Sequence, residues 1–263
     1  MKIILDSGAF SAFTRKKDID IEEYIDFIKE NERFLESYIN LDVIGSAEKS
    51  WENQKYLESR GLNPLPVFHH SDDFKWLDKC LEYDHFCLGG IADTPTNAKR
   101  VPFLDKCFRA ICDKDGIPKS KIHGLGVTSP SLLRRYPFYS VDSTSWLMSG
   151  ATGVIIIPQK RRGQYVYNVD PFKIAISSGS SAVGYGQHYD TASPTKRKAV
   201  DEYLEYKGYI TGGPDIPKEE EGSGLYTNHY LRMKLNAEFF RDFMEHLPDY
   251  PFAFKPKRQG SLL

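Results

Sequence analysis

Short apolar runs alternate with segments of helical hydrophobic spacing along residues 1–157. The apolar runs predict strands at residues 3–5, 38–44, 65–68, 86–91, 122–127, 139–142 and 153–157. Helical spacing predicts helices at residues 19–35, 47–60, 72–83, 98–113 and 130–136. This alternation is typical of parallel βα units, and so many units in one chain favour a (β/α)₈ TIM-like barrel over an open sheet.

The last third of the chain is less regular. Residues 177–189 are rich in Ser and Gly and predict a loop, and residues 212–224 form a polar, acidic connection. Helices are predicted at residues 194–206 and 228–247, the second being the terminal helix. The chain has 263 residues, close to the roughly 250 of a typical barrel, so we expect a single α/β domain over residues 1–263.

Polar residues and glycines stand where the predicted strands end. In chain order these positions hold Asp6, Ser7, Gly8, Phe10, Asp42, His69, Gly89, Gly90, His123, Gly126, Asp142 and Ser143. In a barrel the strand ends meet at one face, where active sites lie. The sequence therefore predicts that these residues form the active site.

Three carboxylates carry most of this argument. Asp6, Asp42 and Asp142 each follow a different predicted strand. One such Asp is explained by a capping or loop hydrogen bond, whereas three at separate strand ends favour a shared site. Gly89-Gly90 keeps two readings: a tight turn, or close approach of a flat ligand to the backbone.

No metal or cofactor is expected at this site. Adjacent His69 and His70 point to opposite faces of a strand, so at most one enters the barrel mouth. Together with His123 this falls short of the three or four convergent ligands of a metal centre. The cysteines, at positions 80, 87, 107 and 112, include no Cys-x-x-Cys pair and are expected to be reduced, as in the cytoplasm.

The formal net charge is −1, so binding to nucleic acid would depend on local patches. Basic clusters occur at residues 15–17, 160–162, 196–198 and 255–258, and each alone is typical of a solvated surface. The chain turns polar too soon after Met1 for a signal peptide. No apolar run approaches the ~20 residues of a membrane span, so no membrane partner is expected.

In this order, the motifs resemble those of the tRNA-guanine transglycosylase superfamily. The family's Asp-Ser-Gly-Gly-Phe-Gln is similar to residues 6–11, and its base-contacting Asp on the next strand to Asp42. Its Gly-Gly-Leu-Ala is similar to residues 89–92, its Gly-Val-Gly-Thr-Pro to residues 124–130, and its Val-Asp motif to Val141-Asp142. The resemblance covers roughly residues 1–160 and rests on the order and spacing of the motifs.

The chain also departs from the tRNA enzymes. It has no zinc-binding Cys/His segment and no appended RNA-binding module, and Ser145 stands where the family has its nucleophilic Asp. These departures look like the phage and genomic-island relatives that insert 7-deazaguanines into DNA. The resemblance thus implies exchange of guanine in DNA for a free 7-deazaguanine base through a covalent glycosyl-enzyme, without a cofactor.

The resemblance also implies roles for the predicted site residues. Because Ser145 replaces the family's nucleophilic Asp, the role of nucleophile is assigned to the nearby Asp142, and Asp6 is the general acid and base. Asp42 reads the guanine edge, and Phe10 or a Tyr stacks on the base. The other residues expected to bind substrate are Ser7, Gly8, His69, Gly89, Gly90, His123, Gly126 and Ser143.

The target base must be flipped or unpaired to reach such a site, and Lys160, Arg161 and Arg162 are expected to hold phosphates. Additional partner proteins stay an open alternative, and the expected location is the cytoplasm of a bacterium or of a phage-infected host cell. Three rival readings also stay open: the same exchange on tRNA, a non-catalytic nucleic-acid-binding barrel, and an unrelated barrel hydrolase. The missing zinc segment favours DNA over tRNA.

Overall fold

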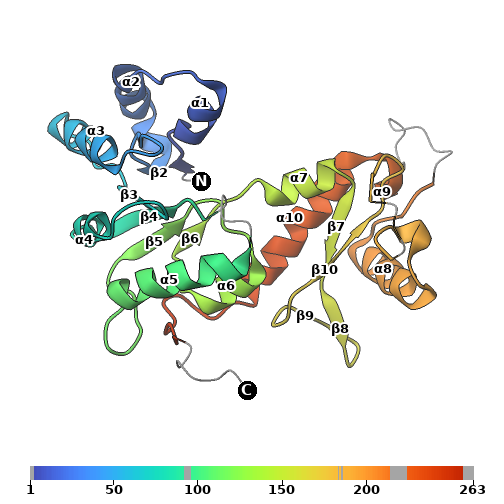
Figure 1. Ribbon diagram of the computed structural model, residues 1–263. Helices are drawn as coiled ribbons and strands as arrows, with labels where there is room; N and C mark the ends of the chain where they lie inside the picture. Colours follow the sequence, from blue (N-terminus) through green and yellow to red (C-terminus); the bar gives the residue numbers. More distant parts are fainter. Residues whose placement is uncertain (1–2, 92–95, 183, 185, 214–223, 257–263) are drawn as a thin grey trace. The chain divides into compact units, whose positions relative to one another are not determined.

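A computed structural model describes residues 3–91, 96–182, 184, 186–213 and 224–256 (Figure 1). The chain divides into two compact units. Unit 1 comprises Met1–Val127, Arg135–Asp142 and Tyr250–Leu263, and unit 2 comprises Thr128–Arg134 and Ser143–Asp249. Ala92 of the Gly-Gly motif, residues 257–258 of the last basic cluster and most of the acidic connection lie outside the described residues. A single barrel domain stays a prediction.

Unit 1 alternates strands with helices (Figure 1). The elements in chain order are β1 (Ile3–Leu5), α1 (Ala9–Arg15), α2 (Ile21–Asn31), the 3₁₀ helix η1 (Glu32–Phe34), β2 (Leu35–Tyr38), α3 (Ala47–Ser59), β3 (Val67–His69), α4 (Lys75–Cys80), β4 (His85–Gly89), α5 (Asn97–Ile111), β5 (Lys121–Gly124), α6 (Pro130–Arg135, which leads through unit 2) and β6 (Ser140–Val141). The second strand lies earlier than the predicted 38–44, because the residues after Ile39 form the loop that carries Asp42. Helix α1 was not predicted.

The strands of unit 1 are parallel and follow chain order. β1 pairs with β2, and β3, β4, β5 and β6 form one four-stranded sheet. A parallel bridge between Ile39 and Leu65 joins the end of β2 to the start of β3. The mixed α/β class and the predicted parallel βα pattern of the first half are therefore confirmed. Because the strands are parallel, their carboxyl ends share one edge.

Burial follows the predicted apolar spacing. Ile25 and Ile28 of α2 and Leu57 of α3 are fully buried in one cluster. Phe68 of β3 and Phe86 of β4 are fully buried as well. Helical spacing on the helices and apolar runs on the strands thus produce the core that supports the strand ends.

The segment that returns to unit 1 after residue 250 is fixed by Phe254. Its N–H donates to the carbonyl of Gly116 at 2.8 Å, and its ring centroid lies 5.8 Å from Phe108 and 5.5 Å from Tyr136. A Cβ on Gly116, whose φ is +83°, would lie 2.5 Å from the Phe254 carbonyl oxygen. Only glycine fits there, so unit 1 takes a buried side chain from far along the sequence.

Unit 2 has a different architecture. Its elements after α6 are α7 (Ser145–Ala151), β7 (Val154–Ile157), β8 (Gln159–Arg161), β9 (Gln164–Val166), β10 (Phe172–Ala175), the 3₁₀ helix η2 (Tyr189–Thr191), α8 (Pro194–Lys207), α9 (Gly224–Thr227) and α10 (His229–Glu245). β7 pairs antiparallel with β10, and β8 with β9. Parallel βα units do not predict these pairings. Arg162 (φ +50°) and Gly163 (φ +82°) form the tight turn of the β8–β9 hairpin.

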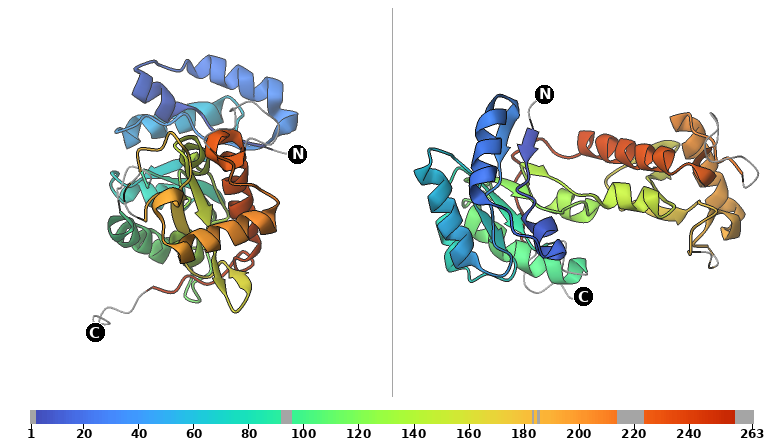
Figure 2. Two further views of the ribbon diagram at one scale, coloured as in Figure 1. Left: turned by 90° about the vertical axis from the view of Figure 1, so that its right-hand side faces the viewer. Right: turned by 90° about the horizontal axis from the view of Figure 1, so that it is seen from above.

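Helix α10 lies beside α7 and β7 (Figures 1 and 2). Asn236 of α10, fully buried, accepts from the N–H of Ile156 at 2.9 Å and donates to the carbonyls of Trp146 and Val154. One amide thus satisfies three backbone groups of the neighbouring elements, which fixes how they pack.

Candidate active site

Unit 1 places several predicted site residues at the carboxyl ends of its parallel strands. Asp6 follows β1, Asp42 follows β2, His69 ends β3 and Asp142 follows β6. The side chains at this edge differ in exposure, because the Asp42 side chain is 7% exposed and that of Asp142 is 45% exposed. The edge therefore offers both a sheltered carboxylate and an accessible one.

Cys87 on β4 is fully buried behind the strand ends. Burial raises the pKa of the Cys87 thiol well above its ordinary value, and the charges of Asp42, Asp142 and Asp6 raise it further. Cys87 is therefore kept in its neutral thiol form. Sequence reasoning did not find Cys87, because a buried Cys on a strand usually indicates core packing.

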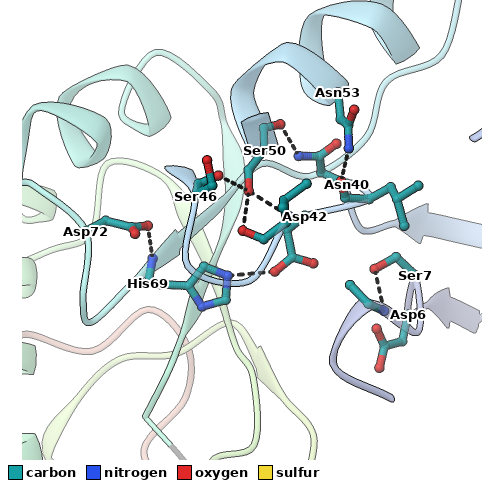
Figure 3. A network of polar contacts seen from close by, with 12 residues as sticks. Asp6, Ser7, Asn40, Asp42, Ser46, Ser50, Asn53, His69 and Asp72 are labelled. Carbon is teal, nitrogen blue, oxygen red and sulfur yellow. Dashed lines mark hydrogen bonds and ion pairs between the residues drawn. The ribbon is translucent and has the colours of Figure 1, made fainter. Parts of the chain in front are cut away.

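Asp42 and His69 form a close, sheltered pair (Figure 3). Oδ2 of Asp42 lies 2.6 Å from Nε2 of His69, whose side chain is 16% exposed. The backbone N–H of His69 donates to Oδ2 of Asp72 at 2.9 Å, which holds the end of β3 in place. The sequence predicted both members of the pair as base-binding residues but did not predict their contact.

The loop that carries Asp42 is fastened to α3 by side-chain hydrogen bonds (Figure 3). Asn40 donates to the carbonyl of Ser50 at 2.7 Å, and Asn53 donates to the carbonyl of Leu41 at 2.7 Å. The Ser50 hydroxyl accepts from the N–H of Val43 at 2.8 Å. These bonds join the loop on both sides of Asp42 to α3, although the loop lies outside regular structure.

Gly89 makes room for the His69 ring. A Cβ at Gly89 would lie 2.7 Å from Nδ1 of His69, closer than real Cβ contacts occur. Gly90 has a φ of +71°, in the left-handed region that favours glycine. A third explanation therefore joins the turn and the ligand contact: Gly89 has to be glycine because the His69 ring occupies the space of its Cβ.

Asp142 is held by one strong bond and remains accessible. The N–H of Gly126, whose φ is +69°, donates to Oδ1 of Asp142 at 2.6 Å. Oδ2 faces Nε2 of His123 at 3.9 Å. Partial burial raises the pKa of Asp142, but the His123 imidazole and the Gly126 N–H outweigh it, so the pKa lies below its ordinary value. Asp142 is therefore ionised at neutral pH.

His123 is 3% exposed, and it has a partner that sequence reasoning missed. Its Nδ1 lies 2.8 Å from the hydroxyl of Ser140 on β6. Ser140 and Asp142 are two residues apart, so their side chains leave the strand end on the same face. A Ser two residues before the predicted nucleophile, beside a His on the preceding strand, is the sequence signal that could have identified Ser140.

Asp6 begins the turn between β1 and α1. Its Oδ1 accepts from the N–H of Gly8 at 3.1 Å, and the Ser7 hydroxyl accepts from the N–H of Ala9 at 3.4 Å. Gly8 has a φ of +74°, which lets the chain enter α1 directly. Asp6 is exposed, and the Phe10 side chain is 55% exposed. Both are therefore accessible from solvent.

The remaining predicted residues belong to unit 2. The Ser143 hydroxyl accepts from the N–H of Ser145 at 3.0 Å, at the start of α7. Lys160 on β8 pairs with Glu202 at 2.7 Å, which raises the pKa of its ammonium group. Arg161 and Arg162 are exposed at the end of the hairpin. Of this basic cluster, only the two arginines lack a carboxylate partner in the described structure.

Among the described residues, no group of three or more His, Cys, Asp or Glu side chains is arranged to hold a metal ion. Within the same ranges, no helix is both long and apolar enough to cross a membrane. Comparison with protein-family models and with curated proteins gives no match to this chain. Its functional reading therefore rests on the site itself.

Proposed function

We propose that this chain is a nucleobase-exchanging transglycosylase, which replaces guanine in DNA by a 7-deazaguanine through a covalent glycosyl-enzyme. The observation that carries the proposal is the state of Asp142, which is ionised, 45% exposed and bonded through one oxygen to Gly126. An anchored and accessible carboxylate is what attack on a sugar carbon requires. Asp6 and Asp42 supply the second carboxylate and the base-reading group at the same strand edge.

The fold part of the proposal is a (β/α)₈ barrel. Six parallel strands in unbroken chain order support it, because a doubly wound sheet reverses the order at its switch point. In a barrel the catalytic residues come from the ends of several strands, as the three aspartates do here.

The chemistry takes two displacements at C1′. A lone pair of Asp142 forms an O–C1′ bond while the C1′–N bond to guanine breaks, and the leaving purine takes a proton from Asp6. The incoming 7-deazaguanine then gives its proton to Asp6 and attacks C1′, and the bond electrons return to Asp142. Two inversions give net retention, as in retaining glycosidases.

Base recognition falls to the sheltered side of the site. Asp42 uses one oxygen for His69, and its other oxygen would accept N–H bonds from the guanine edge. The backbone of Gly89 and Gly90 would approach the flat base, and Phe10 would stack on it. An apolar residue at 42 could not accept N–H groups from the base.

A direct assay tests the proposal. Labelled guanine is incubated with the protein and duplex DNA, single-stranded DNA or tRNA, and label in the polymer is counted. We expect incorporation into DNA, and trapping of a protein–DNA adduct on a denaturing gel. Asp142→Asn should remove both signals, whereas Asp78→Asn, at an exposed position of α4, should leave them.

The outcomes separate the rival functions. Label in tRNA alone would transfer the proposal to tRNA. Binding of DNA without incorporation, in the isolated chain and in host lysate, would support a non-catalytic binding protein. Release of guanine without incorporation would show a hydrolase.

A further inference from the structure

Behind Asp142, unit 1 carries a buried histidine, His123, paired with the hydroxyl of Ser140. The mechanism above uses Asp142 but not His123 or Ser140, although His123 is a buried imidazole with polar partners on both ring nitrogens. A buried histidine whose two nitrogens face different groups has its proton placed by those groups. The location of that proton decides what Asp142 faces.

We infer that Ser140 and His123 are positioning residues for Asp142: the Ser140 hydroxyl donates to Nδ1 of His123, so the imidazole proton stays on Nε2 and faces the carboxylate, and Oδ2 is the attacking oxygen. The nucleophilic role of Oδ2 in this inference rests on the proposed function. The placement of the proton does not depend on it.

The distances decide between the two arrangements of this chain of groups. Nδ1 of His123 and the Ser140 oxygen are 2.8 Å apart, a full hydrogen bond. If Nδ1 carried the proton, the lone pair of Nε2 would face the Asp142 carboxylate at 3.9 Å, an unfavourable contact of two electron-rich groups. If Ser140 donates, Nε2–H faces the carboxylate, which is favourable.

The same distances distinguish the two oxygens of Asp142. Oδ1 accepts the Gly126 N–H at 2.6 Å and is committed to that bond. Oδ2 lies 3.9 Å from Nε2, beyond hydrogen-bond length, so it feels the favourable field of the N–H but keeps its lone pairs. Oδ2 is therefore the better nucleophile, and Oδ1 becomes the ester carbonyl that Gly126 continues to bind.

The other titratable groups around His123 do not compete for this role. On β4, burial lowers the pKa of His85 to about 4, with smaller contributions from His123 and Lys121, so His85 is neutral at neutral pH. Cys87, also on β4, is kept as a thiol by burial and the surrounding carboxylates. Lys121 of β5 lies over the Tyr139 ring at 4.5 Å.

The test reads the proton directly. The ¹⁵N spectrum of the histidine side chains, with His123 assigned by its loss in His123→Gln, distinguishes a proton on Nε2 from one on Nδ1. We expect Nε2–H in the wild type, a shift toward Nδ1–H in Ser140→Ala, and return of Nε2–H in Ser140→Thr, which restores a hydroxyl. Ser37→Ala, which removes a buried β2 hydroxyl that has no hydrogen-bond partner among the described residues, is the matched control and should change nothing.

A second readout follows Asp142. Because the Gly126 N–H binds Oδ1, its amide resonance reports ionisation of the carboxylate, and its titration midpoint should move to higher pH in Ser140→Ala. In the exchange assay, kcat should fall about tenfold, the size of one hydrogen bond, with KM unchanged and recovery in Ser140→Thr.

Proton placement on Nδ1 in the wild type would overturn the inference, even if the protein exchanges bases. An unmoved Gly126 midpoint in Ser140→Ala would overturn it as well. Absence of exchange by the wild type would instead overturn the proposed function, and the nitrogen spectra would still decide where the His123 proton lies.

Discussion

Two Asp–His pairs lie on either side of β4, and the same two residue types interact differently in each pair. Asp42 and His69 are 2.6 Å apart, with side chains 7% and 16% exposed. Asp142 and His123 are 3.9 Å apart, and the Asp142 side chain is 45% exposed. In the first pair the imidazole is hydrogen-bonded to one carboxylate oxygen. In the second the imidazole influences the carboxylate without binding it.

The two geometries suit two different tasks, recognition of a base and covalent reaction with a sugar. A sheltered carboxylate bonded to a neighbour has a fixed direction, which suits recognition of a base. A carboxylate that is anchored through one oxygen and accessible through the other suits a covalent step. The pairs should therefore respond differently to the same substitution, one mainly in stability and the other mainly in rate.

The largest effect is expected at Asp142. Asp142→Asn keeps an oxygen to accept the Gly126 N–H but removes the negative charge, so kcat for base exchange should fall by about a thousandfold or more. The free energy of unfolding should change by no more than about 0.5 kcal/mol, since the side chain is half-exposed. Exchange kinetics and urea denaturation measure the two quantities. Undiminished exchange would remove Asp142 from the nucleophile role.

At Asp42 the expected effect is on stability. Asp42→Ala removes the 2.6 Å contact between Asp42 and the sheltered His69 and should lower the free energy of unfolding by about 1.5–3 kcal/mol. Asp18→Ala, at an exposed position, is the control and should be neutral. Urea denaturation of the two variants gives the comparison. Equal stability of both would mean that the Asp42–His69 contact contributes nothing.

Gly89→Ala tests the Asp42–His69 contact by displacing the His69 ring instead of removing Asp42. The new methyl group would meet Nδ1 of His69 at 2.7 Å, so the ring must move away from Asp42, at about 1–2 kcal/mol. The loss should be smaller in the Asp42→Ala background, where the contact between the ring and Asp42 is already absent. Gly213→Ala, whose Cβ would meet no atom of the described residues within 4 Å, is the control. Additive losses in the double variant would contradict the coupling.

The smallest effect concerns pH. The pKa of Asp142 in the folded state lies below its unfolded value, so its ionised form stabilises the protein above the unfolded pKa. That contribution disappears as the pH falls through the lower folded value. It is small because solvent screens a half-exposed group. The unfolding free energies of wild type and Asp142→Asn should therefore converge as the pH is lowered from 6 to 3, and divergence would show the opposite pKa shift.

The sequence predicted unit 1 better than unit 2 for a physical reason. Parallel βα units bury whole apolar strands beneath amphipathic helices, and both patterns are visible in one sequence. The antiparallel pairing of β7 with β10 joins residues that no local pattern connects. The helix α1 was missed because its exposed Phe10 and Phe13 are apolar residues outside the core.

In the candidate site, the positions of residues could be predicted from the sequence, but the contacts between their side chains could not. The strand-end positions of Asp6, Asp42 and Asp142 follow from spacing, since a parallel strand delivers its last residues to a known edge. The contacts between side chains do not follow from it. Whether His69 bonds to Asp42, and whether Ser140 bonds to His123, depends on register between neighbouring strands and on loops fastened by Asn40 and Asn53.

The packing of Phe254 into unit 1 bears on how the chain is made. Translation delivers β1 to β6 first, but the partner of Gly116 lies more than a hundred residues later. While a ribosome synthesises unit 2, the nascent unit 1 keeps an open seam beside Phe108 and Tyr136. Synthesis of the segment that carries Phe254, rather than completion of the sixth strand, then supplies the last side chain of this packing. A stalled or prematurely terminated chain would present that aromatic seam to chaperones and proteases.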